Sequence, residues 1–165
     1  MRAAAHRYRS ERRWSAALAH LGIGLLVVGL AAEGARRTET RSLQPGATLS
    51  VDAVGGGSVR VTYLGLSRYQ VEEMDREVAS FRLDRAGGDV RLITASRTFD
   101  WDSRRQYDRP GLALGLAGDV IVTIAGRASG DGIVCRLTLR PLASLVWLGG
   151  LLLLVSLFVR GRPAP

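Results

Sequence analysis

The stretch FRLDRAGGDVRLI, residues 81–93, decides the fold, because it predicts two short strands joined by a turn. Apolar residues alternate with Arg and Asp on both sides of the Ala-Gly-Gly at 86–88, which is the period of a half-buried strand. A pair of glycines between two such runs is typical of a hairpin turn. We therefore expect an antiparallel β-hairpin here.

Similar patterns lie on both sides of this hairpin. Alternating or β-branched segments occupy 48–54, 59–66, 77–85, 89–96, 119–126 and 133–140, and glycine clusters separate several of them. Residues 100–118 lack this regularity, so we expect a loop there. Six short strands with close turns predict a small antiparallel all-β domain, a sandwich or a barrel, over residues 33–141.

Two uncharged, apolar runs enclose this segment. They are AALAHLGIGLLVVGLAA at 16–32 and LASLVWLGGLLLLVSLFV at 142–159. As helices they would span about 25 and 27 Å, close to the ~30 Å hydrocarbon core of a bilayer. We predict two transmembrane helices, of which the second is the stronger because it is richer in Leu. Trp14 and Trp147 would then be anchors at the membrane interfaces.

Charge predicts how these helices are oriented. The chain has 23 Arg, no Lys and 15 acidic residues, and its net charge is +8. Residues 1–15 and the tail 160–165 are strongly basic, whereas 33–141 holds 16 Arg against 14 acidic residues. The positive-inside rule places both termini in the cytoplasm and residues 33–141 outside it. The same basic flanks need no nucleic-acid partner, since no aromatic side chains are interleaved with them.

A secretory signal peptide is the alternative interpretation of the first run. A basic flank, an apolar core and Ala31-Ala32 before Glu33 fit that pattern, although 17 apolar residues exceed the usual ~7–15. Cleavage there would remove His20 from the mature protein.

Cysteine and histidine content excludes several classes of site. A single Cys, Cys135, excludes a disulfide within the chain and a Cys-based zinc site. Two His residues leave little room for a multi-His metal site, so we expect no metal beyond a haem iron. A self-contained enzyme is not expected. Cys135 alternates with Ile133 and Leu137, which favours a core position over a reactive thiol.

His20 is the main chemical candidate. At helical spacing it shares one face with Ala16, Gly24 and Val27, so small residues one turn away leave room for a flat macrocycle. Imidazole nitrogen is a standard axial ligand of haem iron, and a polar group within a membrane helix is a functional candidate by default. The alternative is a hydrogen bond between helices. His6 lies outside the span and is expected to be a solvated flank residue.

Three further groups have weaker patterns. The acidic group Glu72, Glu73, Asp75 and Glu77 could chelate a hard cation, but a solvated connection between strands is favoured. The arginines Arg104, Arg105 and Arg109 could meet haem propionates or an acidic partner, but salt bridges within the loop to Asp100, Asp102 and Asp108 are favoured. The glycines Gly22, Gly24, Gly29, Gly149 and Gly150 predict close helix packing.

Five stretches carry a family resemblance. They are RRWSAALAHLGIGLLVVGL, TETRSLQPGATLSV, YLGLSRYQVEEMDREVASFRLDRAGGDVRLITASRTF, GLALGLAGDVIVTIAG and RPLASLVWLGGLLLLVSLF. In this order they resemble the C-terminal part of the CcmF/NrfE-type cytochrome c haem lyase family: its penultimate membrane helix, its final periplasmic domain and its closing helix. The resemblance covers roughly residues 12–160.

The resemblance implies a membrane component of cytochrome c maturation. In the family, the His of the Ala-His-Leu-Gly core is an axial ligand of a membrane-embedded haem b, and His20 occupies that position here. The family reaction joins haem vinyl groups to the Cys thiols of a Cys-x-x-Cys-His segment. The chain would help to hold and reduce haem for this attachment. Its implied partners are the remaining haem lyase polypeptide, a haem chaperone and apocytochrome c.

The chain also departs from the family. The tryptophan-rich periplasmic signature is absent, and residues 33–141 contain no His, so the family's paired periplasmic ligands are missing. We therefore expect a non-catalytic part or subunit of a haem lyase: a split subunit, a truncated gene product or a diverged accessory protein. The alternative is a haem-free, membrane-anchored scaffold that docks periplasmic proteins.

Overall fold

The computed structural model describes residues 2–52, 58–85, 88–115 and 118–160, and it describes side chains only between Trp14 and Val159. The chain divides into two compact units. One comprises Met1–Gly34 with Leu142–Pro165, and the other comprises Ala35–Pro141. The first unit is helical and the second is built of β-strands.

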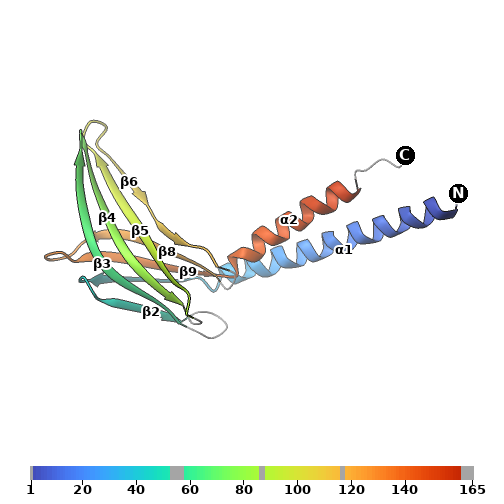
Figure 1. Cartoon of the computed structure of the whole chain (residues 1–165), viewed down its shortest axis with the longest axis horizontal. Helices are drawn as coiled ribbons and strands as arrows, with labels where there is room; N and C mark the ends of the chain where they lie inside the picture. The colour runs from blue at the N-terminus through green and yellow to red at the C-terminus, as the bar shows by residue number, and fades with distance from the viewer. Residues whose placement is uncertain (1, 53–57, 86–87, 116–117, 161–165) are drawn as a thin grey trace. The chain divides into compact units, whose positions relative to one another are not determined.

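The helical unit contains α1 (Arg2–Glu33) and α2 (Ala143–Arg160), so both apolar runs are helical as predicted (Figure 1). Among the described residues, one helical segment, Trp14–Glu33, is long and apolar enough to cross a membrane, as judged by its length and composition. The apolar part of α2, Ala143–Val159, is shorter. The expectation that the second run is the stronger span is therefore not confirmed.

The two helices pack through small residues. A Cβ atom added at Gly22 would lie 2.9 Å from the carbonyl oxygen of Gly149, and one added at Gly29 would lie 2.9 Å from the backbone nitrogen of Val146. Ser15 is buried and its Oγ donates a hydrogen bond to the carbonyl oxygen of Ser156 at 2.9 Å. Backbones approach this closely only where side chains are small.

The predicted glycine packing is thus confirmed at Gly22, Gly29 and Gly149. It is wrong at Gly24 and Gly150, where an added Cβ would meet no atom within 4 Å.

The β unit consists of two antiparallel sheets. Its strands are β1 (Arg37–Leu43), β2 (Thr48–Asp52), β3 (Ser58–Val71), β4 (Met74–Arg85), β5 (Val90–Asp100), β6 (Arg105–Arg109), β7 (Gly111–Ala113), β8 (Gly118–Arg127) and β9 (Ile133–Pro141). A four-stranded sheet has the order β1-β9-β8-β7, and a five-stranded sheet has the order β2-β3-β4-β5-β6. The prediction of an antiparallel β domain is confirmed.

The hairpin from which the prediction began lies in the middle of the larger sheet. Phe81 of β4 pairs with Ile93 of β5, and both are buried in the core between the sheets. The turn residues 86–87 lie outside the described part of the chain. Tyr63 is also buried; its ring lies 5.6 Å from that of Phe81, and its hydroxyl donates to the carbonyl oxygen of Asp131.

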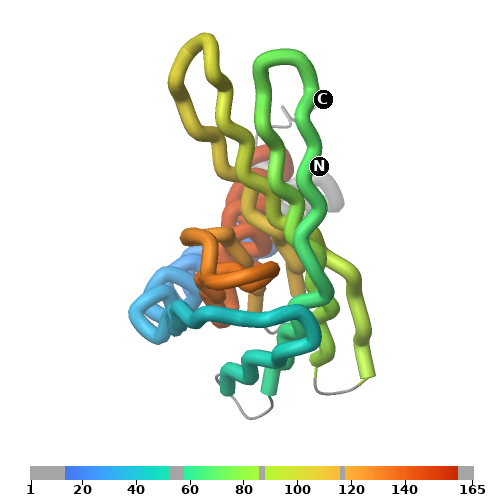
Figure 2. The backbone as a smooth tube through the Cα atoms, turned by 90° about the vertical axis from the view of Figure 1, so that its left-hand side faces the viewer, coloured from blue at the N-terminus to red at the C-terminus, as the bar shows by residue number. Residues whose placement is uncertain are grey.

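Strands occur where the sequence predicted loops. The expected loop at 100–118 contains β6 and β7, and the expected connection around 67–76 is almost entirely the paired ends of β3 and β4. All five residues of β6 are exposed, so it has no buried alternating face to detect. Backbone pairing, not burial, holds β6 and the ends of β3 and β4, whereas β7 also buries Gly111 and Ala113. As a result, the β3–β4 and β5–β6 hairpins extend side by side beyond the core (Figure 2).

Cys135 is completely buried, as predicted, and burial raises the pKa of its thiol to about 11. Because the thiolate is the reactive form, only about a thousandth of this thiol is reactive at pH 8. We expect a disulfide reagent at pH 8 to modify Cys135 at least a hundredfold more slowly in the folded chain than in guanidinium. Equal rates in the two states would contradict a core position.

The helix contact predicts a difference between two neighbouring glycines. Gly22→Leu should separate α1 from α2, because its side chain would meet the Gly149 backbone, whereas Gly24→Leu should leave the pair intact. The measurement is cross-linking by a short reagent with two thiol-reactive groups in a Ser15→Cys/Ser156→Cys, Cys135→Ala background. We expect a loss of product of at least tenfold for Gly22→Leu alone. Equal product in both variants would show that Gly22 does not lie at the contact.

Candidate functional site

His20 lies on a face of α1 that α2 does not cover. Ala16, His20, Gly24 and Val27 are all exposed, whereas the buried positions Ser15, Gly22 and Gly29 recur every seven residues. His20 follows Ser15 by five residues and precedes Gly22 by two, which places it on nearly the opposite side of the helix. The structure thus brings the four predicted residues together as an open stripe.

The imidazole of His20 has a defined hydrogen bond. Its Nδ1 lies 2.6 Å from the carbonyl oxygen of Ala16, one turn earlier. A carbonyl oxygen only accepts, so Nδ1 carries the proton, and the neutral ring then has its lone pair on Nε2. Metal-binding histidines use this arrangement, in which one ring nitrogen donates to a carbonyl and the other faces the metal. This bond lies within α1 and leaves Nε2 without a hydrogen-bond partner among the described residues. The side chain of His6 lies outside the described residues.

The acidic group around residue 75 is not one cluster. Glu72 and Glu73 form the exposed turn between β3 and β4, and Asp75 and Glu77 belong to β4. Glu77 is buried; its Oε1 accepts a hydrogen bond from Arg127 Nε at 2.7 Å and lies 3.5 Å from Arg68 Nε. The prediction of a solvated connection is therefore wrong for Glu77. Within the described residues, no group of three or more His, Cys, Asp or Glu is placed to hold a metal ion.

Glu77 also borders a cavity of about 410 Å³. Phe99 and Trp101 line it as an edge-to-face pair with centroids 4.7 Å apart, and the Trp101 indole donates to Asp75. Arg127 binds Glu77, and Arg97 Nη2 donates to the carbonyl oxygen of Ile124 at 2.6 Å, while the buried Arg97 Nε has no hydrogen-bond partner among the described residues. Since Arg127 and Ile124 belong to β8, these bonds join the two sheets. The side chains around the cavity therefore connect the two sheets. The sequence did not predict this contact, because Arg127 lies 50 residues after Glu77 in the chain.

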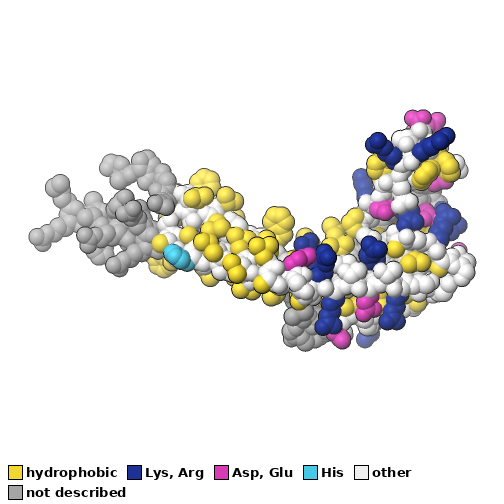
Figure 3. Space-filling view, turned by 180° about the vertical axis from the view of Figure 1, so that it is seen from behind, with side chains coloured by type: hydrophobic (Ala, Val, Ile, Leu, Met, Phe, Trp, Pro, Cys, Tyr) yellow, Lys and Arg dark blue, Asp and Glu magenta, His cyan; other side chains and the backbone are white. Residues whose placement is uncertain are grey.

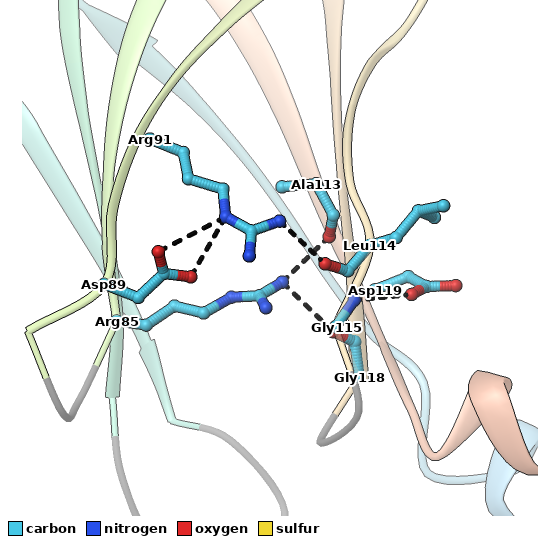
Figure 4. Close-up of polar contacts among 8 residues, drawn as sticks. All are labelled: Arg85, Asp89, Arg91, Ala113, Leu114, Gly115, Gly118 and Asp119. Carbon is cyan, nitrogen blue, oxygen red and sulfur yellow. Dashed lines mark hydrogen bonds and ion pairs between the residues drawn. The ribbon is translucent and has the colours of Figure 1, made fainter.

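Two more arginines connect the sheets where β4 ends and β5 begins (Figure 4). Arg85 Nη2 donates to the carbonyl oxygens of Ala113 and Gly118 at 2.8 and 3.1 Å. Arg91 Nη1 donates to the carbonyl oxygen of Leu114 at 3.1 Å, and its Nε pairs with Asp89. No local pattern in the sequence marks these two residues.

The salt bridges expected within 100–118 do not form as predicted. Asp100 accepts hydrogen bonds from the hydroxyl and backbone N–H of Ser103, which lower the pKa of its carboxyl group. Asp108 lies 3.5 Å from Arg97 Nε, on the neighbouring strand. Arg104, Arg105 and Arg109 make no ion pair within the part of the chain that the structure describes.

Comparison with known proteins gives a consistent result, although no family profile matches the chain. It is 25% identical over 141 residues to the cytochrome c-type biogenesis protein CycK of Rhizobium meliloti (strain 1021), which covers 85% of this chain and 20% of that protein. The CycK protein of Bradyrhizobium diazoefficiens is 26% identical over 141 residues, which covers 85% of this chain and 21% of that protein. The chain therefore spans about a fifth of the length of these relatives.

A solved structure, described as cytochrome c haem lyase CcmF, has the same fold. It superposes with a TM-score of 0.68 at 18% identity, covering 94% of this chain and 25% of that one. The resemblance stated from the sequence is thereby confirmed: over most of its length this chain has homologues named CycK, and it shares the fold of part of CcmF.

Proposed function

We propose that this protein is a membrane component of cytochrome c maturation whose His20 is one axial ligand of a haem b shared with a partner chain. The open stripe around a histidine with a fixed tautomer is the observation that carries this proposal. The relatives' names support the process. The partner would be the remaining haem lyase polypeptide, since the chain matches only a fragment of such proteins.

The residues present fit a haem. An axial ligand needs a neutral imidazole with an available Nε2, and the hydrogen bond from Nδ1 to Ala16 leaves that nitrogen free. It also needs space for a macrocycle, which Ala16 and Gly24 leave one turn away on each side. The chemistry that haem iron supplies is one-electron transfer, and the hydrogen bond to Nδ1 makes Nε2 a stronger donor. His20 thus binds and orients, while the attachment of haem to apocytochrome c, delivered with a haem chaperone, would take place on the partner.

The helical unit supports the proposed membrane location. Large apolar side chains cover α1 and α2 outside their contact, including Leu21, Leu30, Leu151, Leu157 and Phe158, all more than half exposed. A helix that is apolar all round belongs in a protein core or a bilayer. We therefore propose membrane spans at 16–32 and 142–159, an extracytoplasmic domain at 33–141, and cytoplasmic ends at 1–15 and 160–165 in a bacterial inner membrane. Trp14 and Trp147, both largely exposed, would lie at the interfaces.

His20→Ala should abolish or strongly weaken the b-type haem spectrum of the complex purified in mild detergent with its partner chain. The reason is loss of the Nε2 ligand; membrane insertion should persist, because the helix becomes more apolar. His6→Ala is the matched control and should keep the spectrum. Gly24→Leu should also lower haem content, since its side chain would occupy the open stripe without touching α2.

Two results would count against this ligand. Equal haem content in the wild type and in His20→Ala would overturn it. A haem-free wild-type complex would favour the alternative scaffold function instead.

The proposed topology predicts a protease pattern. In sealed, right-side-out membranes, protease should cut only within 33–141, because the basic flanks lie inside. Detergent-opened membranes are the control, in which both ends should also be cut. External digestion of the tail would contradict two spans, and a mature N-terminus at Glu33 would establish the signal peptide and remove His20.

A further inference from the structure

The ends of the β3–β4 and β5–β6 hairpins form a four-stranded extension with two distinct faces. Directly opposite residues share a face in an antiparallel sheet. Tyr69, Arg76, Thr98 and Tyr107 form one such row across β3, β4, β5 and β6. Glu77 and Arg97, one residue along, belong to the inner face, where their charges are bound to the other sheet. The row therefore lies on the outer face, which we call the outer tip face.

The outer tip face exposes apolar and aromatic side chains. Tyr69, Val71 and Tyr107 are 53%, 60% and 51% exposed, and Met74 is 46% exposed. Hydrophobic side chains lie beside basic and acidic ones at this end of the β unit (Figure 3). Exposed clusters of Tyr, Met and Arg are typical of protein interfaces, in which these residues are enriched.

The same face contains a hollow of about 350 Å³, lined by Val71, Met74, Arg76, Thr98, Tyr107 and Arg109. Its lining includes two guanidinium groups and no carboxylate. Neither Arg76 nor Arg109 makes an ion pair or a side-chain hydrogen bond with any described residue. The one acidic residue paired onto this face, Asp100 opposite Met74, is bound to Ser103. The lining of the hollow therefore has two positive charges and an apolar wall, while the Asp100 carboxylate, which keeps its charge when bound to a neutral serine, lies on the same face outside this lining.

We propose that the outer tip face binds an acidic segment of a partner protein. Carboxylates of the segment would pair with Arg76 and Arg109, and an apolar side chain between them would enter the hollow against Met74 and Tyr107. Guanidinium–carboxylate pairs are strong and geometrically specific. The exposed Glu72 and Glu73 at the adjoining turn would repel a long polyanion, which favours discrete carboxylates over a nucleic acid or an anionic bilayer.

This site is independent of the proposed function, since it uses a different unit of the chain from His20. Haem content therefore reports on one proposal and peptide binding on the other, and either can fail alone.

The test is selection of random twelve-residue peptides on the full-length protein in detergent. We expect the enriched peptides to combine Asp or Glu with an aliphatic or aromatic residue. Labelled copies should bind Arg76→Ser/Arg109→Ser at least tenfold more weakly than wild type. Arg60→Ser/Arg136→Ser is the matched control: it removes the same charge from exposed arginines elsewhere in the sheets and should bind as wild type does.

A second variant checks the apolar part of the site. Met74→Glu puts a carboxylate at the wall of the hollow and should weaken binding by a similar factor, with an unchanged circular dichroism spectrum because Met74 lies outside the core. Failure to enrich peptides that depend on Arg76 and Arg109, or enrichment without acidic residues, would overturn the proposal. Binding of a labelled oligonucleotide or of phosphatidylglycerol vesicles that the double variant abolishes would overturn it as well.

Discussion

Hydrogen bonds from arginine side chains to backbone carbonyls hold the two sheets of the β unit together where the apolar core ends. Arg85 and Arg91 bind β7, β8 and the segment between them, and Arg97 binds β8 farther along the same sheet. A buried backbone carbonyl left without a hydrogen-bond donor costs about 1–3 kcal/mol, so these guanidinium groups stabilise the contact between the sheets. Beyond this contact β3–β6 continue as two hairpins that their own backbone ladders hold.

The sequence predicted those parts of the fold that bury one face. Strands such as 77–85 alternate because Ala79, Phe81 and Leu83 enter the core, so their period was visible. β6 is fully exposed and β1 buries only Leu43; both are held by backbone pairing, β1 with the distant β9. Neighbouring residues do not encode such pairing. The ion pair between Glu77 and Arg127 could not be predicted for the same reason, since its two residues are far apart in the chain.

The candidate site also has a part that local sequence predicts and a part that it does not. Helical spacing was enough to predict the stripe around His20, because a single helix determines which residues share a face. The tautomer of His20 follows from the hydrogen bond to the carbonyl oxygen of Ala16, four residues earlier. Helical spacing makes this bond possible, but the sequence alone does not predict that it forms. The second ligand could not be predicted, since it would belong to another polypeptide. α1 therefore has two stripes of small residues: one packs against α2 through Gly22 and Gly29, and the other leaves His20 open.

Arginine suits the contacts between the two sheets of the β unit. Arg85 reaches two carbonyls on different strands, which its planar fork of five donors allows and the point charge of a Lys would do less well. Such arginines are already committed to the fold. Arg76 and Arg109 satisfy no carbonyl or carboxylate among the described residues, although they are carried by the same sheet. What distinguishes them from other exposed arginines is that both line the same hollow, where their donors are available to another molecule.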